Sequence, residues 1–368
     1  MPDSMAEEIL HTNELKDRPI PLELPRVEEW KEIPIQENGE PLVALGSFSE
    51  NDVIFTDSIY FGERNDSPYT PTTPEGSLVT MFVRQDVAEQ LKKAQEVLPQ
   101  GMYLVVFDSY RTIEVQQALF DKYFRELQEQ HPDWDKDKLL TETQGYVSLP
   151  STDPTKPSPH NTGGSVDLAI FQLPQGIDDQ VKKINQQISI AGDNWQEVYK
   201  LEMKKIALIR NNAKLLNFGT PFDWGGEEAA PNYFERSATI RRLKPEEEDA
   251  KENRRVLYHS MISAGFEPYP VEWWHFNSRK TQMGAEAAGK QKAEYGAAKL
   301  SDENLKHEKM REDHRLGSIR ILEGARLAGK TNILEEAFRV AQQAVSETGD
   351  PRITSLPQAS IIAPPKRE

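Results

Sequence analysis

The spacing of hydrophobic residues divides this 368-residue chain into short strands and amphipathic helices. Apolar positions recur every three or four residues over 84–98, which predicts a helix, and a second helix is expected to begin near Thr112. Between them, the apolar run 102–107 is too short for a buried helix and rich in valine, so it predicts a central strand. Alternation over 165–171 predicts another strand, and 245–265 reads as a helix that begins at a proline and ends at a glycine.

Changes in composition predict how the chain is organised. Residues 1–40 are acidic and rich in proline without periodicity, so we expect an extended or partly ordered arm. The main domain is expected over residues 41–278, with a helical insertion at about 175–218. Residues 279–349 are rich in Ala, Glu, Lys and Arg and predict an accessory helical region, with helices around 283–298 and 301–346. A Pro-rich tail follows at 350–368.

The composition also argues against several classes of protein. The net charge of -16 and the lack of a basic stripe argue against a protein that binds nucleic acid. The first thirty residues lack the features of a secretory signal, and no apolar run approaches the roughly 18 residues of a membrane span, so we expect a cytoplasmic protein without membrane segments. Because the chain has no cysteine, a zinc site must be made of His, Asp or Glu, which favours an open, catalytic site.

Two imidazoles and two carboxylates stand in short motifs more than a hundred residues apart. His160 and Asp167 flank a Gly-Gly step, and Glu272 and His275 flank two tryptophans. Together they form the minimal set for a hydrolytic zinc site: three ligands leave a position for water, whose pKa zinc lowers to roughly 7, and the fourth group acts as a base. Either histidine alone is more often a core residue, so the prediction depends on the combination.

The first pair of groups needs a turn between them. His160 and Asp167 are seven positions apart and would face opposite sides of a regular strand. We therefore expect a turn at Gly163 and Gly164, where glycine tolerates the backbone angles that fold His160 back toward Asp167.

The second pair needs an irregular backbone. Residues 272–277 predict an aromatic-rich strand, and on a flat strand Glu272 and His275 would point in opposite directions. Both reach one metal only if the backbone bulges or twists there. Simple packing in the core accounts for Trp273 and Trp274 as well as a role in the site does.

Two further charged side chains are candidates for substrate contacts. Arg111 follows Asp108 at a strand-to-helix junction, where it either pairs with a carboxylate or aims its guanidinium at negative charge on a tetrahedral intermediate. Asp223 ends the segment Gly-Thr-Pro-Phe-Asp, and its chemistry alone favours an ordinary turn or helix-capping aspartate.

Four motifs occur in the order seen in D-alanyl-D-alanine dipeptidases of the vancomycin-resistance type, which are zinc D,D-peptidases of peptidase family M15. They are Asp108-Ser109-Tyr110-Arg111, the Ser-x-His-x-x-Gly-x-x-x-Asp run from Ser158 to Asp167, Gly219-Thr220-Pro221-Phe222-Asp223 and Glu272-Trp273-Trp274-His275. The resemblance covers about residues 50–278. It implies a compact α+β domain with a small antiparallel sheet flanked by helices, which agrees with the pattern of elements.

The resemblance also implies the roles of the site residues. One Zn²⁺ per chain would be bound by His160, Asp167 and His275, although another divalent metal remains an alternative at such a site. Glu272 would be the general base that takes a proton from water, and Arg111 would polarise the scissile carbonyl.

On the same grounds, Asp223 would bind the free α-amino group of a small D,D-dipeptide, and Ser158 would lie near its carboxylate. Three positions depart from the family pattern. Ser165 replaces a common alanine, a small change that should be tolerated, and Pro159 replaces a serine, which removes a hydroxyl from substrate recognition. Phe55 aligns loosely with a tyrosine that contacts the amine.

Two other functions share much of this pattern. A D,D-carboxypeptidase acting on cell-wall peptides would use the same chemistry, but without a signal peptide it would lack access to the wall. A non-catalytic zinc module would keep the fold as a binding surface and lose the base or the arginine, yet Glu272 and Arg111 are both present. The insertion at 175–218 is expected either to cover the cleft or to form a docking surface.

Overall fold

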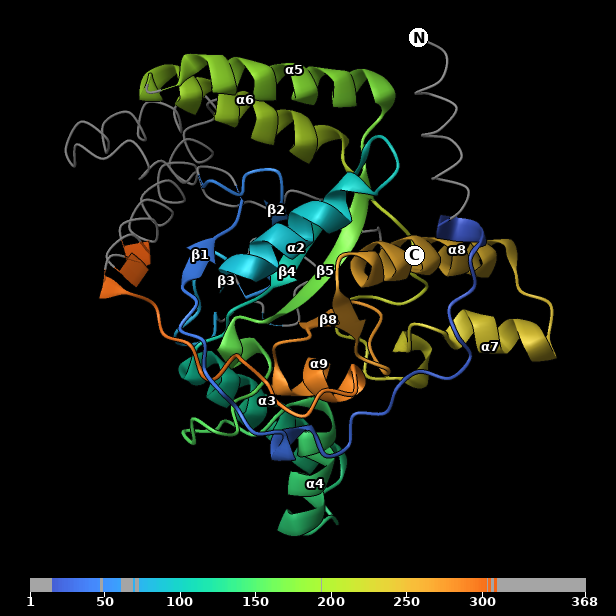
Figure 1. Cartoon of the computed structure of the whole chain (residues 1–368). Helices are drawn as coiled ribbons and strands as arrows, with labels where there is room; N and C mark the ends of the chain where they lie inside the picture. Colours follow the sequence, from blue (N-terminus) through green and yellow to red (C-terminus); the bar gives the residue numbers. More distant parts are fainter. Residues whose placement is uncertain are drawn as a thin grey trace, which may run out of the picture.

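A computed structural model shows a mixed α and β chain arranged around one central sheet (Figure 1). It describes residues 15–46, 49–60, 69, 73–192, 194–302, 304–305 and 308–309. The mixture of helices with small sheets in this part of the chain agrees with the predicted α+β class.

The central sheet is mostly antiparallel. In order across it lie β2 (Phe55–Thr56), β4 (Met102–Asp108), β5 (Ser165–Gln172), β8 (His275–Ser278) and β7 (Phe266–Pro268), and β6 (Lys214–Leu215) pairs with the end of β5. Strand β2 runs parallel to β4, and the other pairings in this sheet are antiparallel. A separate two-stranded ladder joins β1 (Leu42–Ala44) to β3 (Phe82–Arg84).

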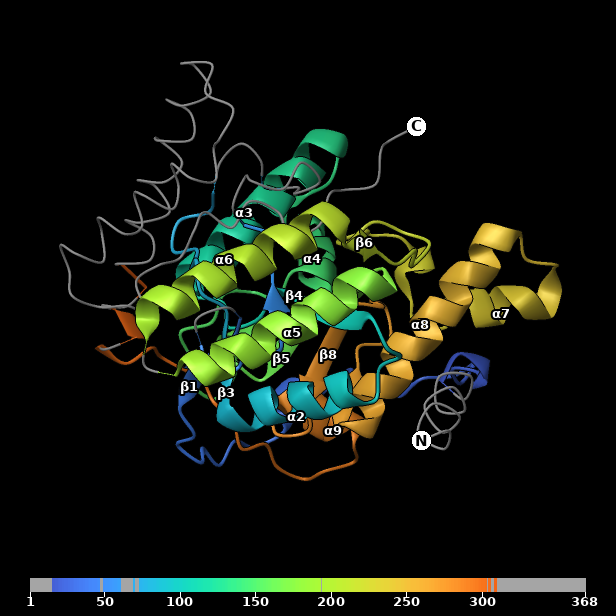
Figure 2. The same ribbon diagram turned by 90° about the horizontal axis from the view of Figure 1, so that it is seen from above.

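Strands β4 and β5 form the centre of the hydrophobic core. Residues 104–108 and 165–171 are buried at every position, as expected for strands covered on both faces. Seen from above, α2 (Gln85–Glu96) and α8 (Pro245–Ser263) lie on one side of these strands, and α3 (Ile113–Gln130) and α4 (Lys136–Tyr146) lie on the other (Figure 2). The bounds of α2, α3 and α8 match the predicted helices within a few residues, whereas α4 was not predicted.

The predicted insertion is a helical hairpin made of α5 (Gln175–Ala191) and α6 (Trp195–Asn212). It follows the last residue of β5 and packs at the top of the molecule in Figure 1, while β5 begins at the opposite end. None of the described residues of the hairpin lines the candidate cavity described below. The expectation that this insertion covers the cleft is therefore wrong for the described residues.

The N-terminal arm is part of the packed structure. Residues 15–17 are helical, and the rest of the arm to residue 40 is largely irregular, with one short 3-10 helix, η1 (Trp30–Glu32). Ile20 is 1% exposed, and Ile35 forms a bridge to Ala293 from the other end of the described chain. The arm thus lies alongside segments that are distant in sequence.

The region after β8 begins with a short helix, α9 (Gln282–Ala287), which contacts η1 and β7. A longer helix was predicted over 283–298, but residues 288–300 are not helical. Their backbone instead binds the arm and the turn that carries His160, through bonds such as Ala298 N to the carbonyl of Asn161. The second predicted helix, over 301–346, lies mostly outside the described residues.

Between β6 and α8 lie η3 (Glu227–Ala229) and α7 (Tyr233–Ile240). Among the described helices, none is both long and apolar enough to cross a membrane.

Candidate active site

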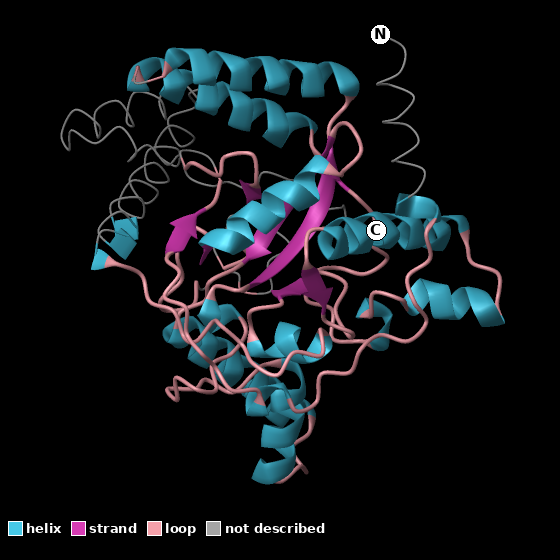
Figure 3. Ribbon diagram, in the orientation of Figure 1, coloured by secondary structure: helices cyan, strands magenta, loops and turns pink. Residues whose placement is uncertain are grey.

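The register of the sheet aligns three polar residues across neighbouring strands. Asp108 on β4 lies opposite Asp167 on β5, and Asp167 lies opposite His275 on β8. The β4 register shifts between Val106 and Asp108, so β4 is irregular next to this row, as strands near active sites often are. Loops gather at this end of the sheet (Figure 3).

A glycine turn brings His160 to the same place. Residues His160–Thr162 form a short 3-10 helix, η2, which ends at Gly163 with a φ of 69°, in the left-handed region that glycine adopts easily. A Cβ at Gly163 would collide with Leu42, and one at Gly164 would collide with Thr281. The predicted turn is confirmed, and both glycines are needed for it.

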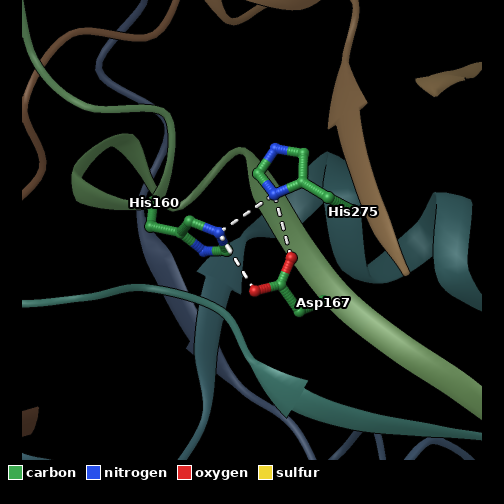
Figure 4. A group of neighbouring side chains, drawn as sticks. All are labelled: His160, Asp167 and His275. Atoms are coloured by element: carbon green, nitrogen blue, oxygen red, sulfur yellow. Dashed lines mark hydrogen bonds and ion pairs between the residues drawn. The ribbon is translucent and has the colours of Figure 1, made fainter. Parts of the chain in front are cut away.

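Three potential ligand atoms converge in the close-up of Figure 4. His160 Nε2 lies 3.2 Å from His275 Nδ1 and 3.4 Å from Asp167 Oδ2, and His275 Nδ1 lies 2.9 Å from Asp167 Oδ1. All three residues are buried, with exposures of 5–6%. The structure thus brings together the three predicted ligands.

The donor set fits a divalent metal. Ligand atoms about 2.1 Å from a tetrahedral zinc ion are about 3.4 Å apart, close to the spacings found here. His160 Nδ1 donates to the carbonyl of Ser109 at 2.9 Å, which leaves Nε2 with a free lone pair toward the cluster. The three residues therefore fit a metal site with two nitrogens and one oxygen.

The charges of the cluster are mutually stabilising. Burial opposes the ionised form of Asp167, but His160 and His275 outweigh burial and hold its pKa well below the usual range. Burial likewise lowers the pKa of His160, but Asp167 and Asp108 outweigh it and raise that pKa. Asp167 is thus anionic at neutral pH, the form that a metal ligand requires.

Glu272 reaches the cluster from a turn and not from a strand. Strand β8 begins at His275, so the predicted strand over 272–277 is too long at its start. The turn puts Glu272 Oε2 3.9 Å from His275 Nδ1, which removes the need for a bulge. Burial, supported by Asp167 and Asp223, raises the pKa of Glu272 to about 8. Such a carboxylate has a proton affinity suited to a general base near neutral pH.

Arg111 both pairs with Asp108 and lines the cavity. Its Nε lies 3.0 Å from Asp108 Oδ2, its Nη2 contacts the same oxygen, and its Nη1 donates to Gln116 Oε1 at 3.0 Å. The Tyr60 hydroxyl also donates to Asp108. The side chain of Arg111 is 13% exposed, and these partners hold its guanidinium at the cavity wall.

Asp223 adds a second carboxylate to the cavity. It has a φ of 63°, an unusual value for a residue other than glycine and a kind of strain that often marks functional sites. Its Oδ2 accepts a hydrogen bond from the Tyr69 hydroxyl at 2.9 Å, and burial raises the pKa of Asp223. The simple turn interpretation is therefore incomplete, because this turn aims its carboxylate into the site.

Phe55 does not take part in the site. It lies in β2, is 4% exposed and packs against Tyr103 and Phe171. Tyr69 is the tyrosine that contacts Asp223 and lines the cavity, whereas Phe55 is absent from the cavity wall. Tyr69 was missed because it lies in a Pro- and Thr-rich segment without periodicity.

The cavity has a volume of about 100 Å³. Besides the residues above, its walls include Ser158, Pro159, Gln116, Tyr146, Tyr269, Trp274 and Met283. Drug-sized ligands occupy about 300–1,000 Å³, so this cavity suits a small substrate. Ser158 is 2% exposed and its hydroxyl donates toward Asn161 Oδ1 at 2.9 Å.

The two tryptophans of the fourth motif pack into the core. Trp273 stacks on Phe218 with ring centroids 4.2 Å apart and donates to Thr220 Oγ1, whereas Trp274 lines the cavity. Both are almost fully buried.

Comparison with known proteins supports the class that this site suggests. A family model described as D-ala-D-ala dipeptidase matches residues 203–292, which include Asp223, Glu272 and His275. The match extends beyond residue 278, the predicted end of the main domain. It indicates that the chain is an enzyme of the metallopeptidase class.

Two curated relatives narrow the assignment within that class. The D-alanyl-D-alanine dipeptidase of Synechocystis sp. is 26% identical over 268 residues, which cover 67% of this chain and 84% of that protein. The D-alanyl-D-alanine dipeptidase of Enterococcus faecium is 24% identical over 237 residues, 60% of this chain and 89% of that protein. With the family model, they support the D-alanyl-D-alanine dipeptidases of peptidase family M15 as the family of this chain.

Proposed function

We propose that this protein is a zinc-dependent dipeptidase that hydrolyses D-alanyl-D-alanine or a similar small D,D-dipeptide to free amino acids. The observation that carries the proposal is the convergence of His160, Asp167 and His275 in one small cavity with Glu272 and Arg111. The names of the two relatives support the same substrate. When bound, zinc supplies Lewis-acid activation of water near neutral pH.

In this proposal, Glu272 moves the proton. As a carboxylate next to the metal ligands, it takes a proton from the attacking water. The water oxygen joins the carbonyl carbon, the C–N bond breaks, and Glu272 returns the proton to the departing amine. Its raised pKa suits both halves of this transfer.

Arg111 stabilises the negative charge that develops on the carbonyl oxygen. Asp108 and Gln116 hold its guanidinium, so little reorganisation is needed when the charge appears. The low exposure of the Arg111 side chain strengthens this interaction, because water screens it less.

The ends of the substrate would be recognised by opposite charges and by hydrogen bonding. Asp223 offers a carboxylate in the cavity wall to the free α-amino group, and Tyr69 orients that carboxylate. Ser158 lies in the wall that also carries Pro159 and His160, and its hydroxyl would turn from Asn161 Oδ1 to donate to the substrate carboxylate. A serine at 159 would have added a second hydroxyl, and its loss leaves Ser158 as the donor from this motif.

The amine-binding carboxylate also bears on the carboxypeptidase alternative. A longer or capped peptide has an amide where the dipeptide has a charged amine, so Asp223 would lose the charged partner that the free amine offers. The presence of Asp223 and the small cavity therefore favour a free dipeptide.

The deciding experiment measures release of D-alanine from D-alanyl-D-alanine by the purified, zinc-loaded full chain. N-acetyl-D-alanyl-D-alanine serves as the capped competitor and Glu272→Ala as the inactive control. Cleavage of the free dipeptide that is lost in the variant supports the proposal. Preference for the capped peptide would show a carboxypeptidase, and zinc binding without turnover of either would show a binding module.

A further inference from the structure

A second cross-strand pair lies next to the pair that contributes two of the ligands. Asp167 is opposite His275, and two positions along each strand Ser165 is opposite Asn277. Residues two apart on a strand point to the same face, so all four side chains share one side of the sheet. Ser165 and Asn277 are 0% and 1% exposed, which shields their hydrogen bonds from water.

Asn277 links His275 to two further residues. Its Oδ1 lies 3.2 Å from His275 Nε2 and accepts the Ser165 hydroxyl at 2.7 Å. Its Nδ2 donates to the sulfur of Met283 on α9 at 3.3 Å. Every polar atom of this amide therefore has a partner, and each partner comes from a different element.

These contacts select one orientation of the amide. The Met283 sulfur accepts hydrogen bonds only, so Nδ2 faces it and Oδ1 faces His275. His275 must then carry its proton on Nε2, which leaves the lone pair of Nδ1 toward Asp167 and His160. With the amide reversed, Nδ2 would face Nε2 and the proton would be on Nδ1, where a metal could not bind.

We infer that Asn277, oriented by Ser165 and Met283, is a positioning residue of the metal site that fixes the metal-binding tautomer of His275. The inference depends on the proposed metal site. The tautomer of His160 needs no positioning side chain, because its Nδ1 donates to a backbone carbonyl, which can only accept a hydrogen bond. Ser165 is thus more than a tolerated replacement of alanine, since its hydroxyl holds the amide oxygen in place.

The test measures zinc affinity of the full chain by competition with a chromophoric chelator, and the absorption spectrum of the cobalt(II) form. Asn277→Leu removes the acceptor and is expected to weaken zinc binding about 10- to 100-fold. Asn277→Asp keeps an acceptor oxygen and is expected to restore affinity to near the wild-type value. Ser165→Ala is expected to weaken binding by a smaller factor.

The matched control is Ser260→Ala. Ser260 is also 0% exposed, but its hydroxyl bonds to the carbonyl of Leu257 within α8, away from the cluster. This variant is expected to keep wild-type zinc affinity and the wild-type cobalt spectrum. Ser165→Ala deletes one hydroxyl from a buried strand, so it keeps the inference testable even where Asn277→Leu fails to fold.

A double variant separates positioning from general stability. If Ser165 acts through Asn277, then Ser165→Ala combined with Asn277→Leu binds zinc as weakly as Asn277→Leu alone. Additive losses, or a lower melting temperature of the metal-free variants with unchanged zinc affinity, would overturn the inference.

The wild-type titration distinguishes this inference from the proposed function. Tight zinc binding by the wild type and equally tight binding by Asn277→Leu would refute the positioning role and leave the dipeptidase proposal intact. A wild-type chain that binds no zinc would remove the basis of both.

Discussion

The Tyr69 hydroxyl donates to Asp223 Oδ2 at 2.9 Å, although 154 positions separate the two residues. Burial and the charge of Asp223 raise the pKa of Tyr69, so the phenol stays protonated and keeps donating. The pair places a carboxylate in the wall of the cavity that also contains His160, Asp167 and His275. Under the proposed function, this carboxylate would hold the amino end of the dipeptide.

Replacing the charged member of this pair should impair substrate binding. Asp223→Asn is expected to raise KM for D-alanyl-D-alanine and to lower kcat/KM about 10- to 100-fold, because a hydrogen bond to a charged group contributes about 1.5–3 kcal/mol. Steady-state kinetics measure this effect. Asp249→Asn removes an equal charge from an exposed position on α8 and should change nothing. A fall in kcat at constant KM would contradict the role of Asp223.

Changing the cation at the cavity wall should impair catalysis more than binding. Arg111→Lys keeps a positive charge but loses the planar group that Asp108 and Gln116 hold, so kcat is expected to fall about 100- to 1,000-fold. Arg255→Lys is a matched control, because Arg255 is also 13% exposed and bonds to a carboxylate, Glu235, outside the cavity. Equal losses in the two variants would show a structural effect only.

The acidic side of the pH profile should report Glu272. Its pKa is raised to about 8 without metal, and a bound cation favours the carboxylate, so the zinc enzyme should show a limb with an apparent pKa below that value. Glu272 must be an ionised carboxylate to accept a proton, so kcat/KM should fall as the pH decreases through this pKa. Asp223 contributes to the raised pKa, so Asp223→Asn should move the limb to lower pH. If Asp223→Asn leaves the apparent pKa of this limb unchanged, the limb reports a group other than Glu272.

Metal should stabilise the folded chain. A ligand present at about 1,000 times its Kd adds about 4 kcal/mol to the free energy of unfolding. Zinc is therefore expected to raise the melting temperature, and a chelator should reverse the rise. His275→Ala should abolish the rise in melting temperature that zinc causes, and Ser260→Ala should retain this rise. An equal rise in the His275 variant would place the zinc elsewhere.

The turn that brings His160 and Asp167 together could be predicted from sequence. The seven-residue spacing of His160 and Asp167 requires a turn, and two adjacent glycines mark where it occurs. The path of Glu272 could not be predicted in the same way. The apolar residues that suggested a strand, Trp273 and Trp274, are buried by tertiary packing within a turn.

Contacts between distant segments were beyond prediction. Neither Tyr69 nor Asn277 lies in a pattern that signals a partner, and each acquires its role only when the sheet and loops are assembled. The same holds for residues 15–40, whose lack of periodicity suggested partial order. Residues 34, 36 and 38 form backbone hydrogen bonds to residues 293 and 294, which hold this part of the arm in place without an amphipathic pattern.

Strand β5 carries Asp167 near its first residue, while the α5–α6 hairpin follows its last residue, Gln172. Strand β5 therefore separates Asp167 from the hairpin by its own length. A change in hairpin length alters only the connection between β5 and β6, which pair at the base of the hairpin through Phe171 and Gln172. Lengthening such a loop costs little, since each doubling adds only about 0.6 kcal/mol of closure entropy. The end of β5 is thus a position where this architecture can gain or lose whole helices while the reacting groups keep their geometry.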